Sequence, residues 1–210
     1  GKTVLNQLAT LWAACTGKTE FVTLLASNAS RAASLMEDLK TWLETNDDLC
    51  DDFPEICVPA RKLERVVHRQ KGQRYKNVPT RIEWGAKRIV FPTIEGSKGS
   101  GVAIACDGME GSEIRGLSFT RSDGRKIRPT LVLVDDPQTR ESAVSKTQCD
   151  YREAIIKADI LGMAGPGKKI ACLITTTVTA VDDLAQRLLD RQRNPDFRGE
   201  RYQLLDSFPT

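Results

Sequence analysis

The tripeptide Gly-Lys-Thr occurs twice near the start of the sequence, at Gly1–Thr3 and at Gly17–Thr19. A phosphate-binding loop ends in these three residues, because its Lys reaches the β- and γ-phosphates of a nucleotide and its Ser or Thr binds Mg²⁺. Such a loop follows a buried strand and opens a helix. The elements on either side therefore decide which copy can hold a nucleotide.

The second copy lacks this setting. The G-x-x-x-x-G-K-[ST] spacing requires a glycine at position 12, where the sequence has Trp12. Residues 3–15 have the apolar spacing of a helix, and Gly17 is a typical residue to end it. We therefore predict a turn at Gly17–Thr19, followed by a buried strand at residues 20–27.

The first copy has a helix directly after it, as a phosphate-binding loop requires. Gly1, Lys2 and Thr3 are thus candidate nucleotide ligands, and Thr3 is also a candidate Mg²⁺ ligand. The strand and first glycine that precede such a loop are not in the sequence, which begins at Gly1 without a Met. We expect a fragment that is cut at both ends and binds ATP poorly by itself.

Two carboxylates end the hydrophobic stretch TLVLVDD at residues 130–136. A continuous apolar run of this kind is typical of a buried parallel strand. Hydrolysis of a phosphoanhydride needs Mg²⁺ near the phosphates and a group that orients and deprotonates water. Asp135 can hold the Mg²⁺ and Asp136 can act on the water, although acid pairs at strand ends also serve as loop starts and helix caps.

The elements that must position these residues alternate between strand and helix, which predicts an α/β fold with a mostly parallel central sheet flanked by helices. Beyond the strand at 20–27 we predict a capped helix at 28–46, short β pieces between 81 and 106, the strand that ends at Asp136, helical residues 139–164, a strand at 168–177 and a helix at 182–193. The strand ends at Asp135 and Thr175 are expected to converge with the Gly1–Thr3 loop on one crevice.

Composition limits the classes of protein. The chain has 210 residues, 40% of them hydrophobic, and no apolar run that could span a bilayer, which predicts one soluble domain. A net charge of +3 is too small to indicate a partner. Six scattered cysteines and a single histidine, His68, argue against a structural zinc site and a His-based triad. We expect reduced, mostly buried thiols in a cytosolic protein.

Other residues have two interpretations. Residues 61–81 hold eight Lys or Arg and one acid. They can follow DNA phosphates or form a solvated loop neutralised by the acidic residues 44–55, and the second interpretation is favoured. Trp12 and Trp42, which share helical spacing with leucines, are predicted to lie in the core. Trp84 is predicted to pack rather than to stack on a base.

Together these segments resemble the ATPase domain of the large terminase subunit of tailed phages. The resemblance covers nearly the whole chain in family order and includes TRIEWGAKRIVFPT at residues 80–93. Its most specific part is the succession of IRG at 114–116, LVLVDDPQT at 131–139 and TTT at 175–177.

This resemblance implies an additional-strand P-loop ATPase that uses ATP and Mg²⁺ to drive double-stranded DNA into a viral procapsid. It also implies a homo-oligomeric ring in the host cytoplasm, with a portal protein and a small terminase subunit as partners and no membrane. The whole of residues 1–210 would be the ATPase domain, and nuclease activity would belong to a further domain outside this chain.

The resemblance assigns roles to the nucleotide site. Gly1–Thr3 match the end of the Walker A loop, and Asp135 matches the Walker B aspartate that holds magnesium. Asp136 stands where this class usually has a catalytic glutamate, which is one methylene longer. We therefore expect Asp136 to act on the water, with Glu141 of the same segment as the alternative.

Two further roles follow from the same resemblance. Thr175, Thr176 and Thr177 match the coupling motif that senses the γ-phosphate. Arg115 matches an arginine finger that reaches the nucleotide of a neighbouring subunit and neutralises charge on the transferred phosphoryl group. Arg128, closer to the strand, is a competing candidate, and Arg115 has the alternative of being a surface residue beside a glycine turn.

Two other functions stay open at this point. A helicase-like nucleic-acid translocase would need a second ATPase lobe after residue 210. A nucleotide-binding or DNA-binding module without turnover is compatible with the replacement of the usual glutamate by Asp136.

Overall fold

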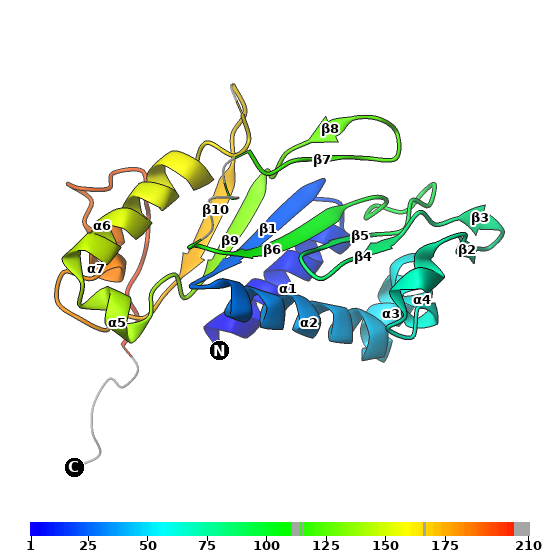
Figure 1. The fold of residues 1–210 in the computed structure, drawn as a ribbon, viewed down its shortest axis with the longest axis horizontal. Coiled ribbons are helices and arrows are strands. Elements are labelled where there is room, and N and C mark those ends of the chain that lie inside the picture. The colour runs from blue at the N-terminus through cyan, green and yellow to red at the C-terminus, as the bar shows by residue number, and fades with distance from the viewer. Residues whose placement is uncertain (111–113, 115, 166, 204–210) are drawn as a thin grey trace, which may run out of the picture.

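The computed structural model describes residues 1–110, 114, 116–165 and 167–203, and within them it has the expected α/β architecture (Figure 1). These residues form a central six-stranded sheet in the order β10-β9-β1-β6-β5-β4. The strands are β1 (Phe21–Ala26), β4 (Glu83–Trp84), β5 (Arg88–Val90), β6 (Ala103–Gly108), β9 (Leu131–Asp135) and β10 (Ala171–Thr175).

Four neighbouring strands of this sheet run parallel. β1 pairs in parallel with both β6 and β9, and β10 pairs in parallel with β9. β5 pairs antiparallel with β6, and β4 antiparallel with β5. The prediction of a mostly parallel central sheet is confirmed, and the carboxyl ends of β9 and β10 meet at one edge, where Thr175 lies opposite Asp135.

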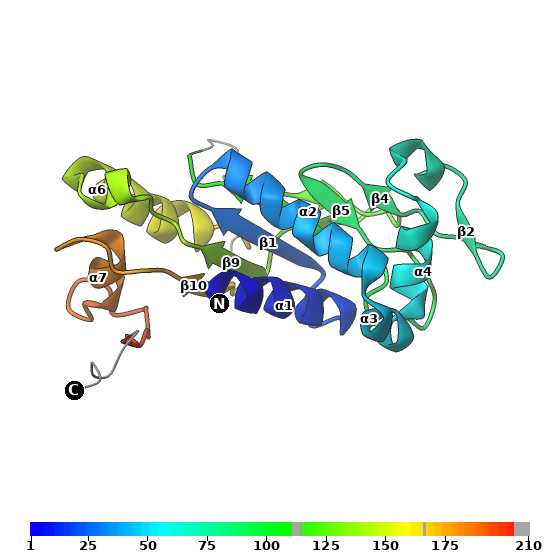
Figure 2. The same ribbon diagram turned by 90° about the horizontal axis from the view of Figure 1, so that it is seen from below.

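Helices α1 (Lys2–Cys15) and α2 (Ala29–Thr45) lie side by side on one face of the sheet, as Figure 2 shows. The side chain of Asn28 caps α2 by accepting a hydrogen bond from the backbone of Arg31 at 2.9 Å. Leu35 and Leu39 of α2 pack against β1, and this cluster forms the main core of the molecule. The predicted helices at 3–15 and 28–46 are thereby confirmed.

The other face of the sheet is covered by two groups of elements. Near β9 and β10 lie α6 (Lys146–Ala154), the π-helical η3 (Ile155–Ile160) and α7 (Leu184–Leu189). Beside β1 and β6 lies the hairpin of β7 (Phe119–Thr120) and β8 (Lys126–Ile127). The predicted helix at 139–164 is divided, because Ser145 caps α6 after the short α5 (Arg140–Ala143).

The remaining elements extend the molecule beside β4. They are α3 (Asp47–Asp52), α4 (Pro54–Lys62), the 3-10 helix η1 (Val67–Gln70) and the small hairpin of β2 (Arg74–Tyr75) and β3 (Val78–Pro79). None of the helices in the described ranges combines the length and the apolar character needed to cross a bilayer.

The prediction that Trp12 lies in the core is wrong. Trp12 is 59% exposed, and Leu5 and Leu8 on the same side of α1 are 56% and 52% exposed. The helix instead turns Asn6, Leu11 and its small residues toward the sheet. Helical spacing identifies residues that share a face, but here the more polar face is the buried one.

The other tryptophans and the cysteines follow the sequence more closely. Trp42 is half-buried against the core, and Trp84 is 3% exposed, which confirms its packing role. All six cysteines are free, four of them buried. Burial raises the pKa of Cys57 and of Cys172 to about 12, so these thiols are protonated at neutral pH.

A buried ionic network joins α6 to α7 and the segment that follows it. Glu153 accepts hydrogen bonds from Arg193 at 2.6 Å and from Asn194 at 3.1 Å, and it pairs with Lys157 at 2.9 Å. The side chain of Arg187 is 2% exposed and pairs with an aspartate on either side of it at 2.7 Å. The network fixes the position of α7 on the sheet.

We predict that this network makes stability depend on pH in the acid range. Burial by itself raises the pKa of Glu153, but the hydrogen bonds outweigh it and lower the pKa from 4.5 to about 2. Since the folded-state pKa is the lower one, the carboxylate stabilises the fold fully above about pH 4.5, and this contribution of about 3 kcal/mol is lost as the pH falls toward 2. Urea unfolding should show a steeper loss of stability over this range for wild type than for Glu153→Gln, and equal slopes would contradict the prediction.

Candidate functional site

The N-terminus of α1 lies at the carboxyl ends of β9 and β10. Lys2 and Thr3 occupy the first turn of α1, and Gly1 is its N-cap without a side-chain cap. The first backbone N–H groups of a helix have no partner within it and favour a negatively charged ligand. The structure thus places the first Gly-Lys-Thr at a helix start beside two strand ends.

Lys2 faces the side chains that follow these two strands. Its ammonium lies 3.5 Å from Oδ1 of Asp136 and donates a hydrogen bond to the hydroxyl of Thr177. The hydroxyl of Thr177 in turn donates to Oδ1 of Asp136 at 3.3 Å. The side chains of Lys2 and Asp136 are 41% and 46% exposed, so a ligand and water can reach them.

Thr3 contacts the carboxylate of Asp135. Its hydroxyl donates to Oδ2 of Asp135 at 3.0 Å, and the Asp135 side chain is 1% exposed. Arg31 of α2 lies next to both, since its Nη2 is 3.2 Å from the Thr3 hydroxyl and 3.6 Å from Asp135 Oδ2. A buried carboxylate is stabilised here by a hydroxyl and a guanidinium from two different helices.

Asn6 is a site residue that the sequence reasoning missed. Its Nδ2 donates to Asp135 Oδ1 at 3.0 Å and to the Thr175 hydroxyl at 2.7 Å. It lies three residues after Thr3 and therefore on the same side of α1. This spacing of three residues from Thr3 is the signal in the sequence that could have indicated it. Its Oδ1 is buried and finds no hydrogen-bond partner in the described part of the chain.

The backbone turns sharply after β9 at Asp136. Asp136 has a φ of +45°, in the left-handed region that Asp adopts more easily than most residues. Its N–H donates to the carbonyl of Thr175 at 2.9 Å. The buried guanidinium of Arg152 donates to the carbonyls of Pro137 at 2.5 Å and of Ser27 at 3.3 Å. These bonds hold the carboxylate of Asp136 outside the sheet and toward Lys2.

The segment after β10 is tied to the start of α7. Gln138 donates to the carbonyl of Thr177 at 2.8 Å and to Oδ2 of Asp183 at 2.9 Å. Asp183 caps α7 and also accepts the backbone N–H of Thr179 at 2.7 Å. Burial by itself raises the pKa of Asp183, but these hydrogen bonds lower it overall, so the cap is ionised. These hydrogen bonds link the backbone of Thr177 to the N-terminus of α7.

Thr3 and Asp135 fit the chemistry of a magnesium–nucleotide site. Mg²⁺ prefers oxygen ligands and is usually held by one or two carboxylates together with water and substrate phosphates. A hydroxyl and a carboxylate 3.0 Å apart match this donor set. The described residues contain no cluster of three or more His, Cys, Asp or Glu that could hold a metal by itself, so the phosphates would have to complete the coordination.

Other predicted site residues are not part of this constellation. Glu141 is exposed in the first turn of α5 and contacts neither Lys2 nor Asp136 by any hydrogen bond or ion pair in the described ranges. Arg115 lies outside the described residues. Arg128 precedes β9 and lies against Gly165, at the opposite end of the strand from Asp135. Arg128 is therefore remote from Lys2 and Asp135.

The second Gly-Lys-Thr forms a turn at the amino end of β1, as predicted. Gly17 has a φ of +67°, and a Cβ there would lie 2.3 Å from the carbonyl oxygen of Lys98. Lys18 packs over the ring of Trp12 at 5.8 Å. This copy is not near the ends of β9 and β10.

The basic residues 61–81 are partly neutralised. Arg61 pairs with Asp47 at 2.9 Å and Arg65 with Glu44 at 3.2 Å. Both acids belong to the acidic residues 44–55, which supports the solvated-loop interpretation over DNA contact.

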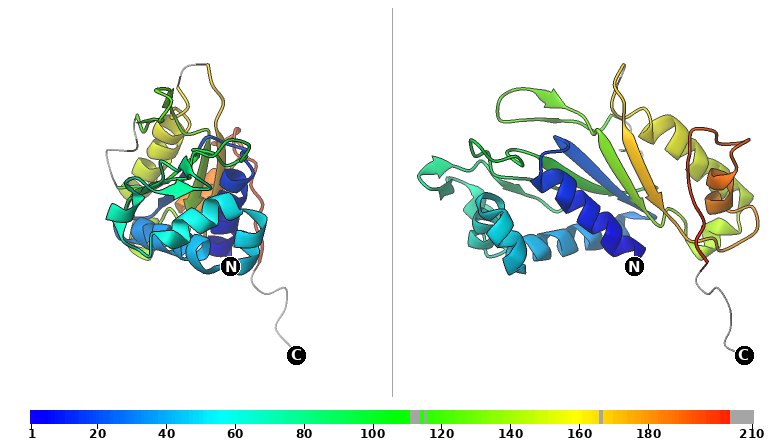
Figure 3. Two further views of the ribbon diagram at one scale, coloured as in Figure 1. Left: turned by 90° about the vertical axis from the view of Figure 1, so that its right-hand side faces the viewer. Right: turned by 180° about the vertical axis from the view of Figure 1, so that it is seen from behind.

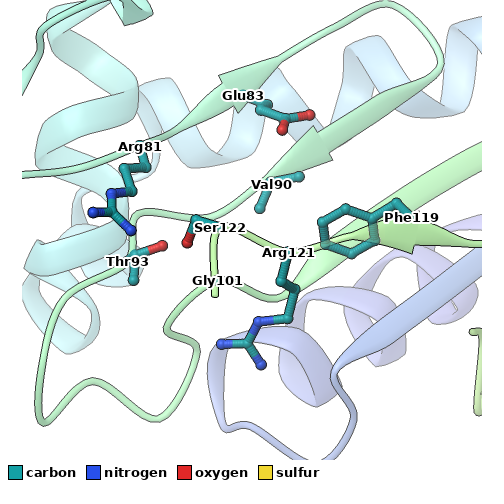
Figure 4. A pocket seen from close by; sticks show the side chains of 8 residues that line it. All are labelled: Arg81, Glu83, Val90, Thr93, Gly101, Phe119, Arg121 and Ser122. Carbon is teal, nitrogen blue, oxygen red and sulfur yellow. The ribbon is translucent and has the colours of Figure 1, made fainter. Parts of the chain in front are cut away.

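A shallow pocket lies apart from the constellation, between β4, β5 and the β7–β8 hairpin (Figure 4). One of its two arginines, Arg121, is already paired with Glu20 at 2.7 Å. None of its lining residues belongs to the group around Lys2 and Asp135. Its lining residues are Arg81, Glu83, Val90, Thr93, Gly101, Phe119, Arg121 and Ser122.

Comparison with known proteins adds no identification. No protein-family model, no curated protein and no solved structure matches the chain.

Proposed function

We propose that the chain is an ATPase domain of the P-loop, additional-strand type that works as a DNA-packaging motor, as in the large terminase subunit. The main support for a nucleotide site is that two groups of residues converge. Lys2 and Thr3, at a helix start, lie beside Asp135, Asp136 and the Thr175–Thr177 segment. Lys2 and Thr3 are residue types that bind phosphate and Mg²⁺, and the two aspartates can hold the metal and accept a proton from water.

The open edge of β10 supports a P-loop in particular. Within the described residues β10 is the last strand of the sheet on the side of the site, and Leu173 in it is 41% exposed. The strands β1 and β9 are by contrast almost entirely buried. This edge gives room for the strand that leads into a Walker A loop, beside the start of α1.

The side chains divide the work of hydrolysis among them. Lys2 neutralises the β- and γ-phosphates, and the free N–H groups of α1 add donors. Magnesium, when bound, supplies Lewis-acid stabilisation of charge on the phosphates; Thr3 and Asp135 are the groups that would hold it. Asp136, exposed and oriented by Thr177, accepts the proton of the attacking water. Through their hydrogen bonds, Thr177 and Gln138 transmit the presence or loss of the γ-phosphate to α7.

The first experiment compares Lys2→Ala with Lys18→Ala in the natural protein. Lys2→Ala removes a charge-assisted contact worth about 1.5–3 kcal/mol, so we expect ATP affinity to fall about 10- to 100-fold and DNA-stimulated hydrolysis to fall with it. Lys18→Ala removes the same residue from the other Gly-Lys-Thr and should leave both unchanged. Nucleotide titration and phosphate release measure the two quantities. The proposal fails if both variants behave alike.

A further inference from the structure

Exposed cations gather at the amino end of the parallel strands, the edge opposite to the Lys2–Asp135 site. In the sequence, at least one exposed lysine or arginine precedes each of the four parallel strands. These residues are Lys18 before β1, Lys98 before β6, Lys126 and Arg128 before β9, and Lys168 and Lys169 before β10. The carboxyl ends, in contrast, carry Asp107, Asp135 and Asp136.

Two of these cations project from the β7–β8 hairpin. Ile127 is 8% exposed and packs with Phe21 and Phe119, whereas its neighbours Lys126 and Arg128 are exposed. Side chains alternate between the two sides of a strand. Lys126 and Arg128 therefore both face away from the core.

The cations before β10 lie beside those before β9. Ala171 pairs with Leu131 in parallel register, and its N–H donates to the carbonyl of Thr130 at 2.9 Å. Neighbouring strands lie about 4.8 Å apart, so the segments that enter them are adjacent. Figure 1 and the right half of Figure 3 both place the β7–β8 hairpin and the segment entering β10 at the same end of the sheet. We call Lys126, Arg128, Lys168 and Lys169 the amino-end patch.

The charge of the amino-end patch is not neutralised within the described part of the chain. All four side chains are exposed, and none has an ion pair or hydrogen bond there. In the same hairpin Arg121 pairs with Glu20 at 2.7 Å and Arg125 with Asp123 at 3.0 Å. The hairpin is thus fixed by its paired arginines.

Crowded cations without counter-charges repel one another. This repulsion has a cost in free energy, and a bound polyanion removes it. Duplex DNA offers about one phosphate charge per 1.7 Å of its axis. Lysine and arginine contacts to phosphates need no base sequence.

We propose that the amino-end patch contacts the phosphate backbone of double-stranded DNA. The choice of duplex DNA rests on the proposed function, whereas the patch rests on the geometry alone. β9 and β10 run directly from the patch to Asp135 and Thr175, so DNA and nucleotide would lie at opposite ends of the same two strands. Residues 61–81, the sequence-based candidate for DNA contact, are not needed for this binding.

The test measures affinity of the natural protein for a fluorescent duplex by anisotropy, without ATP and at several salt concentrations. One variant carries Lys126→Gln, Arg128→Gln, Lys168→Gln and Lys169→Gln. The matched variant carries Lys62→Gln, Lys71→Gln, Lys76→Gln and Arg191→Gln, which removes equal charge from exposed cations elsewhere. Far-UV circular dichroism confirms that both are folded.

We expect the patch variant to bind duplex at least about tenfold more weakly at low salt, with a slope of log affinity against log salt that is shallower by about 3 to 4. The matched variant should bind like wild type. Equal losses in both variants, no loss in the patch variant, or a wild-type protein that binds single strands but not duplex would each overturn the proposal. Because no ATP is present, the result is independent of whether the nucleotide site is correctly assigned.

Discussion

Asp136→Asn should lower the rate of ATP hydrolysis about 10²- to 10⁴-fold while ATP binding is retained. The substitution keeps the size of the side chain but removes the group that accepts a proton, and general-base catalysis contributes about this factor. The geometry favours Asp136 because its carboxylate is 46% exposed and lies 3.5 Å from Lys2 and 3.3 Å from the Thr177 hydroxyl. Under the proposed function, water and the γ-phosphate of ATP would therefore both have access to it.

The matched variant for this prediction is Glu141→Gln, which makes the same chemical change at the alternative base. Glu141 is exposed on α5, without a polar contact to Lys2 or Asp136 in the described structure. We expect its hydrolysis rate to stay within about twofold of wild type. Single-turnover measurements at saturating ATP separate the chemical step from binding. If Glu141→Gln loses activity and Asp136→Asn does not, the roles of the two carboxylates must be exchanged.

Much of the architecture could be predicted because it follows from local patterns. The apolar run that ends at Asp135 has only one stable location, the centre of a parallel sheet covered on both faces. The convergence of strand ends with the start of α1 follows from parallel pairing, which brings the carboxyl ends of strands to one edge. The proximity of Thr3 to Asp135, and of Lys2 to Asp136, could be predicted in this way, because a helix start and a strand end fix where these side chains lie.

The features that were missed depend on contacts between segments distant in sequence. Asn6 binds Asp135 and Thr175, which are more than 100 residues away, and nothing in its immediate sequence shows which face of α1 is buried. The same ambiguity produced the wrong prediction for Trp12. Arg31 reaches Thr3 from α2, and its role depends on how α1 and α2 pack together. Spacing predicts which residues share a face of a helix, but packing decides the direction of that face.

The most severe loss of Mg²⁺-dependent activity is expected for Asp135→Asn. The Asp135 side chain is 1% exposed, and it accepts hydrogen bonds from Thr3 and Asn6 at 3.0 Å while lying 3.6 Å from Arg31. Replacement by the neutral amide removes the one buried negative charge at this point and turns one acceptor into a donor that faces Asn6 or Thr3. Stabilisation by a bound metal amounts to several kcal/mol, so we expect hydrolysis to fall about 10³-fold or more.

The matched control is Asp107→Asn, near the carboxyl end of the parallel strand β6 of the same sheet. Asp107 lies opposite Leu25 in register and is the second-to-last residue of its strand, but it contacts none of the residues around Lys2 in the described structure. Its substitution therefore tests whether a carboxylate at any strand end of this sheet has the same effect. Hydrolysis measured against Mg²⁺ concentration should show a much weaker metal dependence for Asp135→Asn alone. An unchanged Mg²⁺ dependence would place the metal elsewhere and leave Asp135 as a buried partner of Arg31.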